Sequence, residues 1–164
     1  DGYVHELLSY ARAESASLQR VDPFALVKTC LSKQQATLQR HRIEVDLRDE
    51  RREHRDVLAD PVLLGQALTS IITNAAEAMD GGGRLDVRVV GDQPGPFVSI
   101  QFADSGIPAD ILARVTEPYF TTKSRGLGLG LAIAKRIVER FAGRIDISSA
   151  KDQGTVVFAA LKAA

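Results

Sequence analysis

Two aspartate–proline pairs decide where helices can begin in this chain. In Asp22-Pro23 and Asp60-Pro61 the carboxylate suits the N-cap, and the proline suits the first helical position, where a backbone N–H would have no partner. Apolar residues follow both pairs at helical spacing. The first pattern predicts a helix over residues 23–40. The second predicts a helix that starts at Pro61 and ends at three consecutive glycines, Gly81 to Gly83.

Alternation of polar and apolar residues, which is typical of half-buried strands, marks much of the remaining chain. Strands are predicted at residues 42–48, 84–90, 97–103, 144–148 and 155–161. A strongly apolar helix is predicted to follow residues 126–130 and to end near Phe141. Strands outnumber helices and most are joined as hairpins. We therefore expect an α/β sandwich, in which a mixed, largely antiparallel sheet of about five strands is covered on one face by three helices.

The predicted organisation is one domain preceded by a short segment. Residues 1–20 carry a thin apolar stripe at helical spacing and are expected to form a separate helix, while residues 21–164 form the domain. Residues 49–56 are almost wholly charged, and we interpret them as a solvated loop. Because the chain does not begin with methionine, we expect it to be part of a longer protein.

Charge and cysteine content exclude several classes of protein. Lys plus Arg number 21 and Asp plus Glu number 21, so there is no basic excess and no nucleic-acid partner is expected. Cys30 is the single cysteine, which excludes an internal disulfide and fits a reducing, cytoplasmic setting. The apolar runs are too short to cross a bilayer, although the parent protein is free to carry a membrane anchor elsewhere. His41 and His54 form no metal-binding spacing.

A glycine-rich segment is the first candidate for chemistry. Glycines alternate with leucines from Gly126 to Gly130, directly before the last predicted helix. Without Cβ atoms this backbone can approach a ligand closely, and the helix N-terminus behind it favours an anion such as phosphate. The spacing is neither the dinucleotide pattern nor the P-loop, because Leu131 replaces a glycine and no Gly-Lys-Ser/Thr follows. On its own the segment fits either phosphate binding or a plain flexible loop.

Asn74 and Asp104 are the other two candidates. Asn74 is predicted on a flank of the apolar stripe of its helix, where its amide fits either a structural hydrogen bond or Mg²⁺ that nucleotide phosphates already balance in charge. Asp104 follows a predicted strand and precedes Ser105-Gly106. Its carboxylate fits either a turn cap or an acceptor for the exocyclic amine of adenine. The second role would disfavour guanine, which offers a carbonyl at the same position.

Taken in order, these residues belong to a longer signature that closely resembles a known family. It is similar to the ATP-binding catalytic domain of the sensor histidine kinases of two-component systems, in the subgroup typified by nitrogen-regulation and dicarboxylate sensors. The resemblance covers roughly residues 21–162, and its motifs are highly specific in combination. They are Asp60-Pro61, Asn74-Ala-Ala-Glu-Ala-Met79, Asp104-Ser-Gly106, Glu117-Pro-Tyr-Phe-Thr-Thr-Lys123, Gly126-Leu-Gly-Leu-Gly130 and Gly154-Thr155.

The resemblance implies a Bergerat-type fold and a role for each matching residue. Asn74 would hold Mg²⁺, and Asp104 would accept from the adenine amine with support from Thr155. Residues 119–126 would cover the nucleotide, and Lys123 would face its phosphates, so that Asn74 and Lys123 carry the catalysis. The other residues expected to contact ATP are Gly106, Thr122, Gly126, Leu127, Gly128, Leu129 and Gly130.

Partners are implied in the same way. The domain would bind ATP with Mg²⁺ and transfer the γ-phosphoryl to a histidine on a helical hairpin of the same or a partner subunit. Its parent would be a homodimeric kinase that signals through a response regulator. Residues 1–20 resemble the end of the second dimerisation helix. His5 is followed by Glu6 but not by the family's Asn-Pro, so we expect it to be a surface residue and the acceptor to lie elsewhere.

This sequence departs from the family pattern at three places. Ser70 stands where a second asparagine is usual, four residues before Asn74, and it cannot act as a strong base for water attack. The Asp104 loop is two residues shorter than usual, and Thr116 and Tyr119 replace the commoner phenylalanines. Two alternatives therefore remain: a non-catalytic nucleotide-binding or scaffolding domain, and a serine kinase of the anti-sigma type. Ser70 argues against the second, whose pattern has glutamate there.

Overall fold

A computed structural model of the 164-residue chain describes residues 17–79, 81–91, 96–104, 126–150 and 154–164. At 126–130, 148–150, 154 and 155 it describes the backbone alone. Most of the helix predicted over residues 1–20 therefore lies outside the described residues. The last part of that prediction is wrong, because Gln19–Val21 form a strand, β1, which pairs antiparallel with β3, Val57–Ala59.

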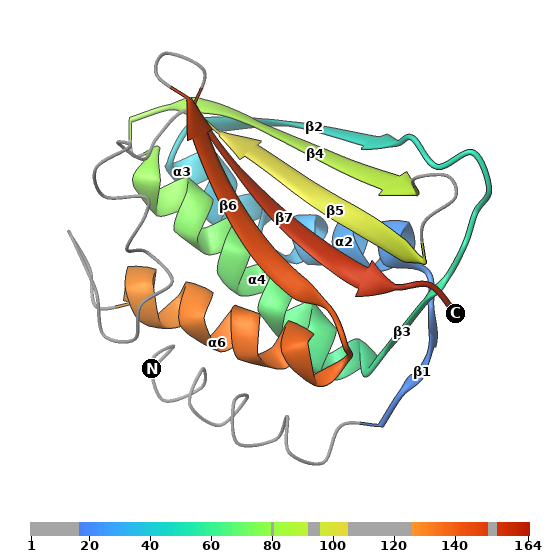
Figure 1. Ribbon diagram of the computed structural model, residues 1–164. Coiled ribbons are helices and arrows are strands. Elements are labelled where there is room, and N and C mark those ends of the chain that lie inside the picture. The colour runs from blue at the N-terminus through green and yellow to red at the C-terminus, as the bar shows by residue number, and fades with distance from the viewer. Residues whose placement is uncertain (1–16, 80, 92–95, 105–125, 151–153) are drawn as a thin grey trace.

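The described part of the chain folds as a two-layer α/β sandwich, as the sequence predicts (Figure 1). One layer holds the helices α2 (Pro23–Lys33), α3 (Gln35–Arg40), α4 (Pro61–Ala78) and α6 (Gly126–Arg140). The other layer is a five-stranded sheet, made in spatial order of β2 (Ile43–Asp49), β4 (Gly83–Gly91), β5 (Phe97–Asp104), β7 (Gly154–Lys162) and β6 (Arg144–Ala150). The β2–β4 pair is parallel and the other pairs are antiparallel, which confirms a mixed, largely antiparallel sheet.

Both predicted helix starts are confirmed. The Asp22 carboxylate accepts a hydrogen bond from the Phe24 N–H at 3.0 Å, and Asp60 accepts from the N–H of Val62 and Leu63 at 3.0 and 3.2 Å. The single helix predicted over 23–40 is wrong, because the chain breaks at Gln34 into α2 and α3. No glycine or proline marks that break, so the spacing of apolar residues could not reveal it. The described helices therefore number four rather than three.

The core lies between the helices and the inner face of the sheet. Helix α4 is central: it packs on the sheet and along α6, and five of its leucine and isoleucine side chains are fully buried, namely Leu63, Leu64, Leu68, Ile71 and Ile72. The alternation predicted for the strands is confirmed, since every second residue of β4 and β5 is buried: Leu85, Val87, Val89, Val98, Ile100 and Phe102. The opposite face of the sheet is open and carries polar pairs.

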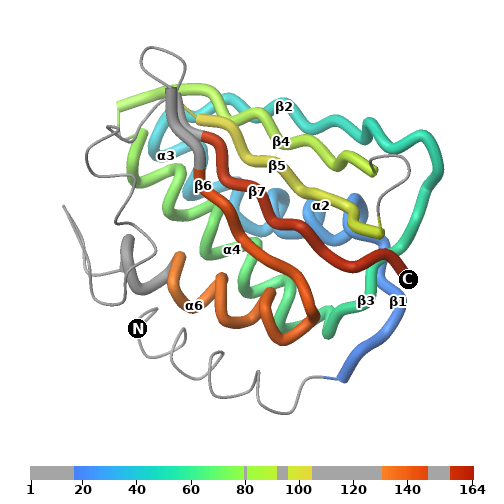
Figure 2. The backbone as a smooth tube through the Cα atoms, viewed as in Figure 1, coloured from blue at the N-terminus to red at the C-terminus, as the bar shows by residue number. Residues whose placement is uncertain are grey.

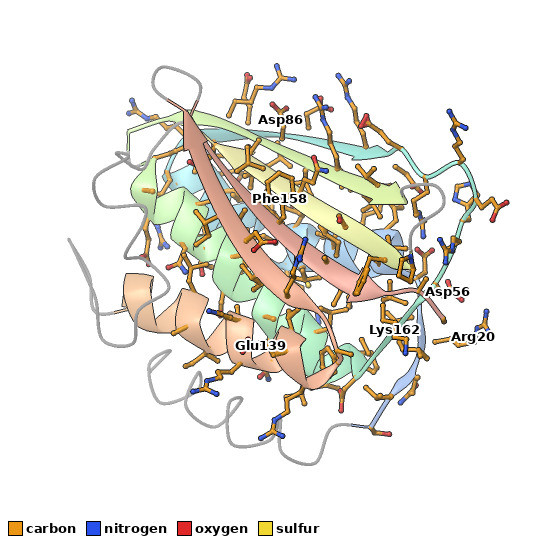
Figure 3. The ribbon with its side chains drawn as sticks, viewed as in Figure 1. Arg20, Asp56, Asp86, Glu139, Phe158 and Lys162 are labelled. Carbon is orange, nitrogen blue, oxygen red and sulfur yellow. The ribbon has the colours of Figure 1, made fainter. Side chains whose placement is uncertain are left out.

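That open face is visible in Figure 3, where Asp86 and Phe158 are labelled. Along β2 and β4, Arg84 contacts Asp46 and Asp86 at 3.1 and 2.9 Å, and Arg48 contacts Asp46 at 3.0 Å. These pairs are solvent-exposed, so each contributes little to stability. They account for the charged positions of the alternating pattern.

The two ends of the described chain meet at β3. Figure 2 traces the backbone from β1, which lies against β3, to the C-terminus at the same end of the fold. Ala163 forms an antiparallel bridge with Val57, and the Ala164 N–H donates to the Asp56 carbonyl at 2.9 Å. A small two-stranded sheet thus closes this end of the molecule.

Candidate functional site

Three elements that carry predicted site residues converge at one end of the sandwich. The C-terminal half of α4, the C-terminal end of β5 and the N-terminal end of α6 all lie on the left side of Figure 1. Asn74 is in that half of α4, Asp104 is the last residue of β5, and Gly126 is the first of α6. The fold therefore brings together segments that lie far apart in the sequence.

Asn74 is a buried amide with an unused donor. Its residue is 5% exposed, and its Nδ2 atom has no hydrogen-bond partner among the described residues. Buried amide groups are almost always hydrogen-bonded, so this donor is open to a group beyond the described residues. The amide oxygen and nitrogen exchange places by a flip about the last side-chain bond, so either can face that partner.

Ser70 lies one helical turn before Asn74 and is 8% exposed. The sequence places Ala67, Ser70 and Asn74 on a flank of the apolar stripe, and all three are buried. Their burial follows from the packing of α6 along α4, which extends the covered face of α4 beyond its apolar stripe. A small hydroxyl thus stands beside Asn74 where a carboxylate would be needed to activate water.

Asp104 is a buried carboxylate at the end of a central strand. It is 6% exposed, and its backbone lies directly opposite Thr155 of β7 in the antiparallel register. The backbones of Asp104 and Thr155 are therefore neighbours in the sheet, as the predicted support of Asp104 by Thr155 requires. A carboxylate oxygen accepts hydrogen bonds at several lone-pair positions, so Asp104 can also accept from an amine-bearing ligand.

The glycine-rich segment lies inside a helix rather than before it. Helix α6 begins at Gly126, so Gly126 to Gly130, with Leu127 and Leu129 between, form its first turns. The prediction of a loop before the helix is wrong on this point, because tertiary packing outweighs the low helix propensity of glycine. The first four N–H groups of a helix have no partner within it, and the helix dipole adds partial positive charge. This end of α6 suits an anion, as predicted.

Several predicted site residues lie outside the described residues. These are Gly106, Thr122, Lys123 and the rest of the segment 119–125, together with His5. Of the described residues, no group of three or more His, Cys, Asp or Glu could hold a metal ion. Mg²⁺ that is bound together with a nucleotide usually takes most of its oxygen ligands from phosphates and water.

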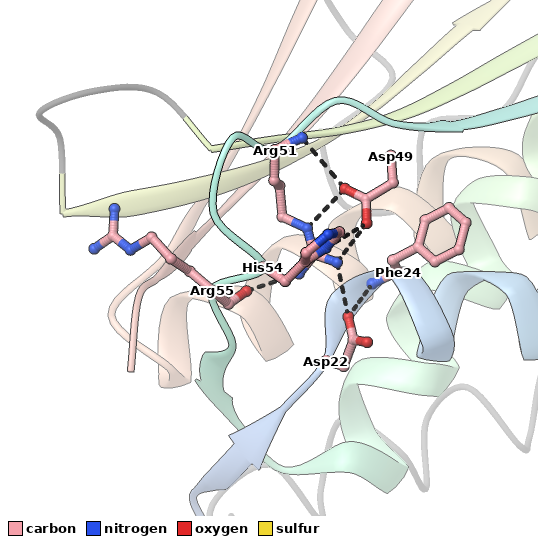
Figure 4. A network of polar contacts seen from close by, with 6 residues as sticks. All are labelled: Asp22, Phe24, Asp49, Arg51, His54 and Arg55. Carbon is pink, nitrogen blue, oxygen red and sulfur yellow. Dashed lines mark hydrogen bonds and ion pairs between the residues drawn. The ribbon is translucent and has the colours of Figure 1, made fainter.

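The sequence analysis missed one buried polar cluster, which lies in the charged segment 49–56. The interpretation of that segment as a solvated loop is wrong for Arg51, whose side chain is 1% exposed. The Arg51 cluster consists of Asp22, Asp49, Arg51, His54 and the carbonyl of Arg55 (Figure 4). A run of mixed charges gave no signal for it, since burial of one arginine depends on which carboxylates the fold brings near.

Within the Arg51 cluster each nitrogen of the guanidinium has at least one partner. Its Nε and Nη2 donate to the two oxygens of Asp49 at 2.8 and 2.6 Å, its Nη1 donates to the Arg55 carbonyl at 2.8 Å, and Nη2 lies 3.1 Å from Asp22 Oδ1. The hydrogen bond from Arg51 lowers the pKa of the Asp49 carboxyl, and the same bond raises the pKa of Arg51. This paired geometry stabilises both charges.

The sequence of this chain matches a known family of ATPases. Residues 59–164 match the family described as histidine kinase-, DNA gyrase B-, and HSP90-like ATPase. That match spans more than half of the chain, and it contains Asn74, Asp104 and the start of α6. The chain belongs to this ATPase family, as the sequence signature indicated.

Individual relatives of the chain are named as sensor histidine kinases. It is 35% identical over 104 residues to an NtrY-like sensor histidine kinase of Rickettsia prowazekii, covering 62% of this chain and 17% of that protein. It is 33% identical over 153 residues to the sensor histidine kinase ZraS of Escherichia coli, covering 93% of this chain and 32% of that protein. The chain thus spans between about a sixth and a third of the length of these relatives.

A solved structure extends the likeness to the fold. Full-length ShkA in complex with AMPPNP is similar with a TM-score of 0.77 and 27% identity, over 98% of this chain and 35% of that one. In the described part of this chain, no helix has the length and apolar character needed to span a membrane.

Proposed function

We propose that this chain is the ATP-binding catalytic domain of a sensor histidine kinase. It binds ATP with Mg²⁺ and presents the γ-phosphoryl to a histidine outside residues 1–164. The observation that carries the proposal is the convergence of Asn74, Asp104 and the start of α6, with an unpaired amide donor on Asn74. Membership of the ATPase family and likeness to named sensor histidine kinases support it.

Different described residues would contact different parts of the nucleotide. Asn74 would hold Mg²⁺ through its amide oxygen, and the N–H groups from Gly126 to Leu129 would hold phosphate oxygens at the start of α6. Asp104 would accept from the adenine amine, with Thr155 beside it in the register. Gly106, Thr122 and Lys123 would complete the site from the segment beyond Asp104. When bound, the metal supplies charge neutralisation on the phosphates.

Ser70 favours transfer to a strong nucleophile over hydrolysis of ATP. Its buried hydroxyl is a poor base at neutral pH, so water beside Asn74 would not be activated. An imidazole needs no such help, because its own ring nitrogen is the nucleophile. The proposed acceptor is therefore a histidine on a helical hairpin of the same or a partner subunit, in a homodimeric kinase that passes the phosphoryl group to a response regulator.

Asn74→Asp tests the metal assignment. The added carboxylate charge would oppose the phosphates and abolish Mg²⁺-dependent phosphoryl transfer, while the fold stays intact. Calorimetric titration of ATP with and without Mg²⁺ measures binding, and labelled ATP measures transfer once acceptor-bearing helices precede Asp1. Thr73→Val is a neighbouring control, since the Thr73 hydroxyl bonds only to backbone carbonyls of its own helix in the described structure. Undiminished transfer by Asn74→Asp would refute the assignment.

A second function, nucleotide binding without catalysis, is favoured by Ser70. The residue replaces the usual asparagine at a buried position beside Asn74, which exchanges an amide for a hydroxyl of shorter reach in the proposed metal site. A domain of this kind would bind ATP in the same titration but would transfer no phosphoryl group. The transfer assay therefore separates the two functions.

A further inference from the structure

Strand β1 is attached to the rest of the molecule by very little apolar contact. It has three residues, of which Gln19 and Arg20 are exposed and only Val21 is partly buried. Among the described strands it pairs only with the three-residue β3. A two-stranded pair of this size is barely stable alone, so side-chain contacts must decide whether β1 stays in place.

Three polar contacts hold the segment that contains β1. The Ser17 N–H donates to Asp60 Oδ2 at 3.0 Å, Arg20 lies 3.9 Å from Asp56, and Asp22 Oδ1 lies 3.1 Å from Arg51 Nη2. The Arg20 contact is long and exposed, so it contributes little. The Asp22 contact differs, because its arginine is buried and held in place by other bonds.

Arg51 is a rigid anchor for this contact. Both oxygens of Asp49, at the end of β2, bind its guanidinium, and the Arg55 carbonyl binds a third nitrogen. Figure 4 shows the same guanidinium reaching across to Asp22, directly after β1. Because the Arg51 side chain is already ordered by its other bonds, it loses little conformational entropy when Asp22 binds it.

We propose that Arg51 and Asp22 are positioning residues that fix β1 to the α/β sandwich that carries the proposed ATP site. The contact sets the direction from which the preceding chain enters the domain. This inference rests on the proposed function in one respect: the acceptor histidine is reached through the chain that precedes β1. Under that function, the Arg51–Asp22 contact holds bound ATP in register with its acceptor, which raises the effective concentration of one near the other.

Asp22→Asn isolates the contact from the helix that Asp22 caps. Asparagine caps helices as well as aspartate does, so α2 keeps its start, while the ion pair with Arg51 is lost. Asp46→Asn is the matched control, because Asp46 also pairs with arginines on the surface but lies away from β1. Hydrogen exchange of the 164-residue chain, read on peptides from 17–22 and from the middle of α4, measures the effect.

We expect exchange of 17–22 to become roughly threefold faster in Asp22→Asn, because the amide oxygen can still accept from Arg51 while the negative charge of the acceptor is lost. Exchange in α4 should stay within twofold, and trypsin should cut faster after Arg20. Asp46→Asn should change neither readout. Unchanged exchange of 17–22 would overturn the proposal, and so would a uniform rise across the chain, which would show a general loss of stability.

The functional arm uses the protein with acceptor-bearing helices before Asp1. In Asp22→Asn we expect the rate of phosphoryl transfer at saturating ATP to fall about threefold or more, with the Kd for ATP unchanged. A rate equal to or above that of the unchanged protein would overturn the positioning role. If the unchanged chain binds no ATP, the proposed function fails, and hydrogen exchange still decides whether the contact holds β1.

Discussion

Among the described residues, polar side chains are buried in two regions, which differ in whether the buried groups find hydrogen-bond partners within the chain. In the Arg51 cluster the guanidinium has all its bonds within the chain, to Asp49, Asp22 and the Arg55 carbonyl. At the proposed nucleotide site, the buried Nδ2 of Asn74 has no partner among the described residues. The paired buried charge holds elements together, whereas the buried amide has a donor that the described residues leave unused.

The two regions also differ in how they affect the free energy of unfolding. An unpaired buried amide lowers stability, and natural proteins accept that loss where function needs it. A buried charge with all its bonds raises the cost of removing any one partner instead. Substitutions in the Arg51 cluster should therefore lower the free energy of unfolding and leave ligand binding unchanged. Substitutions at Asn74 should weaken ligand binding and leave the free energy of unfolding nearly unchanged.

The largest difference is expected between Arg51→Met and Asn74→Ala. The first removes the buried guanidinium that pairs with Asp49 and Asp22 and should lower the free energy of unfolding by about 3 kcal/mol, with the Kd for Mg²⁺-ATP nearly unchanged. The second removes an unpaired group and should change the free energy of unfolding by less than about 1 kcal/mol while it weakens ATP binding. Urea unfolding and ATP titration of both variants provide the measurements. Equal losses of stability would break the comparison.

A smaller effect is expected at Asp104, the other buried polar group of the site. Asp104→Asn keeps the shape of the side chain but adds a donor, so the preference for ATP over GTP should fall by about tenfold, or 1.4 kcal/mol. Competition between the two nucleotides measures this. Asp86→Asn, on the open face of the sheet, is the control and should leave the preference as it is. An unchanged preference in Asp104→Asn would remove Asp104 from base recognition.

The smallest effect concerns pH and the Arg51 cluster. The pKa of Asp49 is lowered from its ordinary value of 3.8, first by the hydrogen bond from Arg51. A lowered pKa in the folded state adds stability above pH 3.8, and that stability is lost as the pH falls through the lower folded value. The stability gap between the unchanged chain and Asp49→Asn should therefore narrow below about pH 4. Urea unfolding from pH 7 to pH 3 tests this, and a constant gap would contradict it.

The sequence predicted the architecture well where local chemistry governs it. Asp22 and Asp60 located two helix starts, and alternation located the five strands of the main sheet to within two residues at each end. The site residues Asn74 and Asp104 were found through a motif, and the fold brings them to one end. The roles proposed for them remain predictions.

The features that escaped prediction depend on contacts between distant segments. β1 and β3 are too short to show a period, and each exists because the other is beside it. Arg51 looks like any member of a charged run until Asp22, 29 positions earlier, is placed next to it. Likewise α6 begins within the glycines because it packs along α4, which no local propensity reveals.

The position of β7 has a consequence for how this domain is made. β7 is the last strand in the sequence, yet it lies between β5 and β6 inside the sheet. While a ribosome is still synthesising residues 154–162, the nascent sheet is split and two strand edges stand open. Residues 154–162 must leave the exit tunnel before β6 can join the β2–β4–β5 part of the sheet, so the sheet of this domain is completed only once β7 has been synthesised.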